Sequence, residues 1–184
     1  MRTDEIIEFI RKNIEPLPPI PPYGERYRTS VTLKDGLHLP YVVFENASRY
    51  VDLAIKRFDE TRRDKSLNIM TDYRAIVRSF VTTGNTVNEC DIREVGISSF
   101  AIPLVRGREI GGETSMSWTE FYATMYDGTE FRFGTTFLEE FFEMPDGYTA
   151  TDIQKILPAV RGEKPRHEKI YRERPFFTCY VDGM

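Results

Sequence analysis

Hydrophobic residues at helical spacing open the chain. They share one face of a helix with 3.6 residues per turn: Ile6, Ile7, Phe9, Ile10 and Ile14. Thr3 is a residue type that caps helix N-termini, and Pro16 cannot continue a helix. We therefore expect an N-terminal helix within residues 1–15.

Five prolines follow within residues 16–25. Proline fixes φ and lacks an N–H group, which excludes a helix and a central strand and favours an extended polyproline conformation. The segment is expected to be a rigid strap on the protein's own surface. Its PxxP spacing leaves open a second interpretation, a ligand for an SH3-type domain.

Two segments alternate apolar and polar residues around an Asp-Gly pair, at 35–36 and at 127–128. A two-residue turn would place apolar residues opposite polar ones, whereas a three-residue loop with a left-handed glycine gives each hairpin one apolar face. We expect this bulged register, with positive φ at Gly36 and Gly128. It gives these pairs: Leu33 with Leu37, Val31 with Leu39, Thr29 with Tyr41, Tyr27 with Val43, Met125 with Thr129, Ala123 with Phe131, and Phe121 with Phe133.

The other segments are predicted as further helices and strands. Asn46 is expected to cap a helix over 47–61, which outweighs its interpretation as a glycosylation sequon. The apolar residues expected to point inward from this helix are Val51, Ala54, Ile55 and Phe58. Further helices are expected at 71–84, at 136–143 and, capped by Thr149 or Thr151, up to Pro158. A strand at 77–81 stays open as the alternative for the first of these. A broken strand is expected at 89–105 and a closing strand at 176–181.

These elements predict an α+β protein, a twisted antiparallel sheet of about six strands with four or five helices packed mainly on one face. With 184 residues the chain is long enough for one core without disulfide or metal. We expect a single domain over 1–184, in which the helix of 1–15 and the strap of 16–25 precede an α+β body over 26–184.

Charge and cysteine content narrow the classes of protein. The net charge of −4 gives no general attraction to nucleic acid or to an anionic membrane. The start of the chain lacks the apolar core of a signal peptide, and the longest uncharged stretch, residues 95–105, is too short to cross a bilayer. Cys90 and Cys179 form no CxxC pair, so we expect a cytoplasmic protein with reduced thiols.

The charges are unevenly distributed. Residues 113–146 hold eight acidic side chains and one basic one, whereas residues 161–174 hold six basic and three acidic side chains. Either they are two solvated surfaces that help each other fold or keep the protein soluble, or they form a bipolar surface that binds a partner or a second copy.

Motifs for catalysis are weak. His38 is expected on a strand surface, and His167 lies in a charged run, where its functional alternative is a general base for Cys179 or a serine. Neither the glycines of 107–112 nor the cysteines and histidines have the spacing of a phosphate loop or a zinc site. We therefore predict no catalytic residue, no metal and no cofactor.

Aromatic residues give the stronger signal, since ten of them lie within 118–148. If Phe121 and Phe133 face the core, alternation places an aromatic and acidic set on the other face. These are the candidate binding residues, with Arg132 expected across the aromatic rings: Trp118, Glu120, Tyr122, Tyr126, Glu130 and Arg132. The alternative is that a helix or the strap covers this face.

The function favoured by this residue set is a non-enzymatic interaction or assembly subunit that binds a protein or itself. Two alternatives stay open. One is a small-molecule enzyme with a pocket between sheet and helices, and the other is an acidic inhibitor that mimics nucleic acid through residues 113–146.

Overall fold

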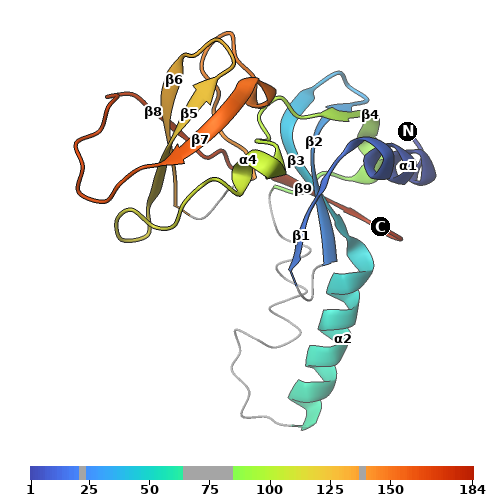
Figure 1. The fold of residues 1–184 in the computed structure, drawn as a ribbon. Helices are drawn as coiled ribbons and strands as arrows, with labels where there is room; N and C mark the ends of the chain where they lie inside the picture. The colour runs from blue at the N-terminus through green and yellow to red at the C-terminus, as the bar shows by residue number, and fades with distance from the viewer. Residues whose placement is uncertain (21–23, 64–84, 137–139) are drawn as a thin grey trace.

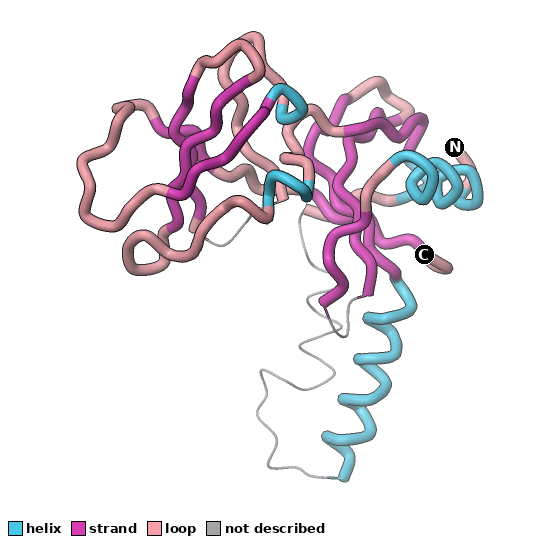
Figure 2. Tube along the Cα trace, in the orientation of Figure 1, coloured by secondary structure: helices cyan, strands magenta, loops and turns pink. Residues whose placement is uncertain are grey.

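The computed structural model describes residues 1–20, 24–63, 85–136 and 140–184 (Figure 1). They form two separate sheets, one of five strands and one of four, each with mixed parallel and antiparallel pairing. The expected single antiparallel sheet with four or five helices on one face is therefore wrong. The described part of the chain is mostly β-structure, with few and mainly short helices (Figure 2).

The first sheet has the strand order β1-β2-β3-β9, and β4 also pairs with β2. β1 and β4 pair with opposite halves of β2, while β9 runs parallel to β3. The proline strap thus contributes an edge strand, a position that tolerates missing N–H donors. The bounds are β1 Pro16–Ile20, β2 Gly24–Leu33, β3 His38–Asn46, β4 Ile92–Ile97 and β9 Phe177–Val181.

The second sheet has the strand order β7-β5-β6-β8, in which β8 runs parallel to β6. β5 and β6 are the arms of the second Asp-Gly hairpin. The bounds are β5 Thr119–Met125, β6 Glu130–Thr135, β7 Ile153–Pro158 and β8 Ile170–Arg172. The expected closing strand also exists as β9, although it belongs to the first sheet.

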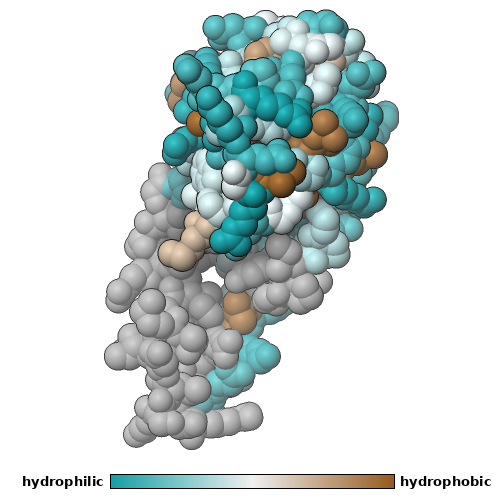
Figure 3. Space-filling model, turned by 60° about the vertical axis from the view of Figure 1, so that its left-hand side comes forward, coloured by the Kyte–Doolittle hydropathy of each residue, from teal (hydrophilic) through white to brown (hydrophobic). Residues whose placement is uncertain are grey.

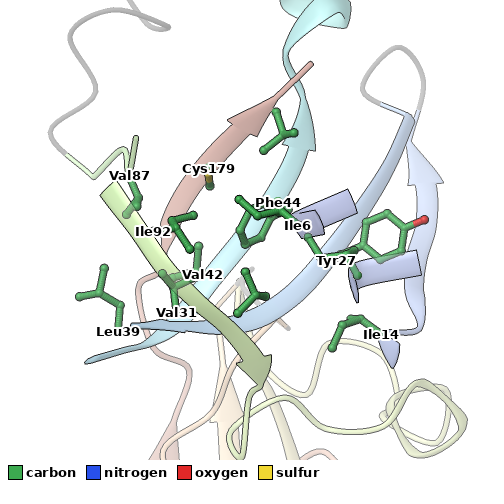
Figure 4. Close-up of a cluster of buried hydrophobic side chains, with 13 residues drawn as sticks. Ile6, Ile14, Tyr27, Val31, Leu39, Val42, Phe44, Val87, Ile92 and Cys179 are labelled. Carbon is green, nitrogen blue, oxygen red and sulfur yellow. The ribbon is translucent and has the colours of Figure 1, made fainter. Parts of the chain in front are cut away.

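Each sheet has its own core. Ile6 and Ile10 of α1 (Thr3–Asn13) pack on the first sheet. Ile14, directly after the helix, belongs to the same core as Phe44 and Cys179 (Figure 4). The second core contains Phe121, Phe133 and Phe142, with the rings of Phe121 and Phe133 stacked 5.4 Å apart. The N-terminal helix is therefore confirmed, although Arg2 rather than Thr3 is its N-cap residue.

Strand β7 occupies the segment for which a helix was expected. Ile153 and Ile156 are three residues apart, as on a helix, and both are buried. A bulge explains this spacing, because Ile153 pairs with Met125 while Lys155 pairs with Thr124, which leaves one residue extra. The helical signal was therefore an interrupted strand alternation, and only the 3₁₀ turn η3 (Ala150–Asp152), capped by Thr149, precedes the strand.

Other expected elements differ in part. The segment 89–105 contains the 3₁₀ turn η2 (Glu89–Asp91) and β4, and it ends within the one-turn helix α4 (Leu104–Gly107). Residues 140–143, the described end of the helix expected at 136–143, are not helical. The helix expected at 71–84 lies outside the described residues.

Helix α2 (Ala47–Arg63) confirms a helix after Asn46, whose Oδ1 accepts a hydrogen bond from the Ser48 N–H at 3.0 Å. The expected inward apolar face is wrong, because Val51, Ile55 and Phe58 are all exposed. The helix begins directly after β3 with no turn between them, so it projects away from both sheets (Figure 1).

Both bulged hairpin loops are confirmed. Leu33 N–H donates to the Leu37 carbonyl and Met125 N–H to the Thr129 carbonyl, each at 2.8 Å, with φ of 94° at Gly36 and 88° at Gly128. The first hairpin departs from the expected register beyond Val31–Leu39, since Thr29 pairs with Val42 and Tyr27 with Phe44. Pro40 has no N–H for the ladder, and this position holds the bulge.

Replacing Gly36 or Gly128 by Val should lower the free energy of unfolding by about 1 kcal/mol or more, because a β-branched residue is strained at positive φ. Gly112→Val is the matched control, since Gly112 has no heavy atom near its Cβ position and no positive φ. Chemical denaturation measures all three variants. Equal stability of Gly128→Val and Gly112→Val would contradict the left-handed conformation.

The two thiols should react at very different rates. Cys90 is exposed, whereas Cys179 is fully buried in the first core, and burial raises the pKa of its thiol to about 12. A chromogenic disulfide reagent should therefore titrate one thiol in the folded protein and two in denaturant, and Cys90→Ser should remove the fast reaction. Two fast thiols in the folded wild type would place Cys179 outside the core.

Candidate functional site

The candidate residues lie mainly on the outer face of the second sheet. Their register is the expected one, because Tyr122 pairs with Arg132 and Thr124 with Glu130. Strand alternation places the phenylalanines of β5 and β6 in the core and sends Glu120, Tyr122 and Arg132 to the opposite face. What covers this face decides whether another molecule can reach it.

A salt bridge between Glu120 and Arg132 lies at the centre of this face. Arg132 Nη2 lies 2.7 Å from Glu120 Oε1, and Arg132 Nε donates to Oε2 at 3.0 Å, so the contact is bidentate. Trp118 Nε1 donates to Glu120 Oε1 at 2.8 Å. Both charged side chains are largely buried, and such a bidentate pair keeps its geometry because little water competes for its hydrogen bonds.

The basic connector, residues 159–169, crosses over Tyr122. Arg166 N–H donates to the Tyr122 hydroxyl at 3.2 Å, and the Arg166 guanidinium lies 4.8 Å from the ring centre. Tyr122 is only 5% exposed, so it does not form the expected exposed platform. The arginine on its ring is Arg166, and the one on Trp118 is Arg172 rather than Arg132.

Acidic and basic regions pair with each other within the chain. Glu130 contacts Arg166 Nη1 at 3.2 Å and His167 Nε2 at 3.0 Å, and Arg174 lies 3.6 Å from Glu143. His167 is thus held by a carboxylate, while Cys179 belongs to the core of the other sheet. These contacts favour the interpretation in which the two charged regions help each other fold.

Tyr126 is separated from this network. It lies in the turn between β5 and β6, is 65% exposed and interacts with Arg106 near α4. The structure thus joins Trp118, Glu120 and Arg132 directly, and links Glu130 and Tyr122 through the connector. Trp118, Tyr122 and Tyr126 therefore do not form one exposed aromatic surface.

A hollow of about 180 Å³ remains above the salt bridge. Glu120, Tyr122 and Arg132 form its floor, and its walls come from residues 114–115 and from 158–166. The charged residues of the second wall are mainly basic. Three of the candidate residues therefore line one concave surface, which we call the outer hollow.

Met116 lies in the turn that forms the first wall and is 91% exposed. Trp118 N–H donates to the Ser115 carbonyl at 2.9 Å, and Thr114 N–H donates to the Trp118 carbonyl at 2.8 Å. Ser117 has a φ of 57°, the only positive value of a non-glycine residue in the described part of the chain. Sequence reasoning missed Met116, although an apolar residue between two serines in a polar turn was a usable signal.

The described residues give little support for a metal site. Histidine, cysteine and acidic side chains do not gather there in threes, as a metal site needs, and His38 is exposed beside the Thr32 hydroxyl. None of the helices described is long and apolar enough to cross a membrane. Comparison with protein-family models, with curated proteins and with solved structures finds no match.

Replacing Glu120 by Gln should lower the free energy of unfolding by about 2 kcal/mol at pH 7, the loss expected for hydrogen bonds to a charged group. Burial raises the pKa of Glu120, but the hydrogen bonds from Arg132 and Trp118 and the charge of Arg132 outweigh it and hold the pKa below its ordinary value of 4.5. The carboxylate's stabilisation is therefore complete above that value and is lost as the pH falls through the lower folded value.

Urea denaturation across the acidic range measures this difference, with Glu94→Gln as a control because Glu94 is exposed. The difference in free energy of unfolding between wild type and Glu120→Gln should shrink below pH 4.5 and stay constant above it. If this difference in free energy of unfolding is the same at every pH, the ionised carboxylate does not hold Arg132.

Proposed function

We propose that the protein is a non-enzymatic interaction subunit that binds another protein at the outer hollow and the adjoining turn. The observation that carries this proposal is the almost complete exposure of Met116 on a turn held by backbone hydrogen bonds. An apolar side chain on a rigid support loses little conformational entropy on binding, and methionine adapts to an irregular partner surface.

The size of the outer hollow supports a protein partner. Its volume of about 180 Å³ lies below the ~300 to 1,000 Å³ typical of small-molecule pockets, and it suits one side chain of a partner. Val160, on the opposite wall, is 59% exposed and offers a second apolar contact. The surface of the second sheet is otherwise mainly hydrophilic, with hydrophobic residues set singly among polar ones (Figure 3). Protein–protein interfaces likewise have an apolar centre surrounded by a polar rim.

The rim favours an acidic partner surface. Arg161 and Lys164 are exposed on the wall that carries Val160, and Glu163 is the acidic residue between them. Arg166 is engaged by Glu130, so it contributes less to an outside molecule. Charge complementarity of this kind raises association rates and orients a partner, while the buried apolar contact supplies affinity.

Met116→Asp should weaken partner binding by about 2 kcal/mol or more, as hot-spot residues do, and should leave the melting temperature unchanged. Val105→Asp is the matched control, because Val105 is an exposed apolar residue on α4 that does not line the outer hollow. A photo-crosslinking amino acid at 116 and at 105 in the full chain identifies the partner by mass spectrometry, and light scattering shows whether it is a second copy.

One protein cross-linked from position 116 and not from 105, with affinity reduced only by Met116→Asp, would support the proposal. Equal cross-linking from both positions, or unchanged affinity of Met116→Asp for the cross-linked protein, would rule out this surface as the contact.

A further inference from the structure

A second pocket, of about 430 Å³, is lined by residues of β1, β2 and α4. Figure 1 shows α4 in the region where the two sheets meet. We call this pocket the inter-sheet pocket. It shares no lining residue with the outer hollow. Its volume lies in the range of ~300 to 1,000 Å³ that small-molecule sites occupy. Most of its wall is apolar: Leu17, Pro18, Ile102, Leu104 and Ile110.

Two arginines of β2 face this pocket. Tyr27 and Val31 point into the first core, so alternation sends Arg26 and Arg28 to the opposite face of the strand, toward the second sheet. Arg28 is only 7% exposed, and burial lowers the pKa of its guanidinium. An ionised group in such a place is costly unless hydrogen bonds and an opposite charge compensate for it.

The hydrogen bonds that the described residues make to these two guanidinium groups are incomplete. Arg28 Nη1 donates to the Glu140 backbone carbonyl at 3.3 Å, and Arg26 Nη1 lies 3.2 Å from Glu140 Oε1. The Nε atoms of both arginines are buried and have no hydrogen-bond partner among the described residues. Glu140 Oε2 is also buried without a partner there, so this carboxylate is not used to satisfy either Nε.

Among the described residues that line the pocket, cationic side chains outnumber anionic ones. Arg26, Arg28 and Arg108 contribute three guanidinium groups, and Glu140 contributes the one carboxylate among the described lining residues. Glu15 also acts on Arg28 through its charge without lining the pocket. A pocket with apolar walls and more guanidinium groups than carboxylates among its described lining residues is complementary to an anion that carries an apolar body.

We propose that the inter-sheet pocket binds a small carboxylic acid with an apolar body, whose carboxylate is held by Arg26 and Arg28. The planar guanidinium presents paired N–H donors that match the two oxygens of a carboxylate. The walls from β1, α4 and Ile110 take up the apolar part of the molecule. This site is independent of the proposed protein contact, and loss of either function leaves the other intact.

Isothermal titration of the full chain with octanoate, 4-phenylbutyrate, 1-octanol and acetate separates the two parts of the recognition. Octanol retains the apolar body without the charge, and acetate retains the charge without the body. The test variant is Arg26→Gln, since Arg26 is less buried than Arg28 and its replacement leaves the first core untouched. The control is Arg93→Gln, because Arg93 is exposed on β4 and does not line the pocket.

At least one of the two carboxylic acids should bind saturably with one molecule per chain. Octanol and acetate should bind to the wild type at least about tenfold more weakly than this acid. Arg26→Gln should also bind the acid at least about tenfold more weakly, because loss of one hydrogen bond to a charged group has about this effect. Arg93→Gln should bind like the wild type. Circular dichroism of each variant checks the fold.

A second pair of variants tests the location. Gly107 lines the pocket and has no heavy atom within 4 Å of its Cβ position, so Gly107→Phe should reduce binding of the acid, whereas Gly112→Phe should not. Failure of both acids to bind saturably would overturn the proposal. Equal affinity for octanoate and octanol, or wild-type affinity in Arg26→Gln or Gly107→Phe, would overturn it as well.

Discussion

The buried charges of Arg26, Arg28 and Glu140 constrain how β2 of the first sheet meets the segment that follows the second hairpin. Both guanidinium groups lie on the face of β2 that points away from the first core, and both reach a residue more than 110 positions further along the chain. Buried charges accept few alternative arrangements, because each one must keep an opposite charge or a hydrogen bond. Near this contact, Tyr41 packs against Phe100 and Phe141, with ring centres 4.9 and 5.6 Å apart.

Opposite charges have a different role on the outer side of the second sheet. There the basic connector is held on the acidic face through Arg166, His167 and Glu130, and it covers Tyr122. Part of the acidic region at 113–146 thus pairs with the basic region at 161–174, through Glu130 and Glu143, while Arg161 and Lys164 stay exposed. What remains accessible to another molecule is the rim of the outer hollow, where Met116 is exposed on its turn.

The two inferred binding surfaces therefore differ in kind. The outer hollow is small and lies beside an exposed methionine. These features suit one side chain of a protein partner. The inter-sheet pocket is larger and apolar, with arginine donors that are not all used. Because they share no residue, one molecule could carry a protein contact and a small-molecule site at the same time.

Local patterns predicted the features that depend on neighbouring residues. The loops at Gly36 and Gly128, the pairing of Phe121 with Phe133 and the strand at 177–181 follow from alternation and turn chemistry. Local patterns misled where a bulge changed the alternation, since Ile153 and Ile156 then have the spacing of a helix.

The sequence by itself determined which residues of each hairpin share a face. Only the tertiary structure decided what covers that face. Arg28 and Tyr122 both lie on polar faces of their hairpins, and both are buried, one beside the second sheet and the other under the connector. The physical reason is that burial depends on contacts with segments distant in the chain, and strand alternation carries no information about which segments those are.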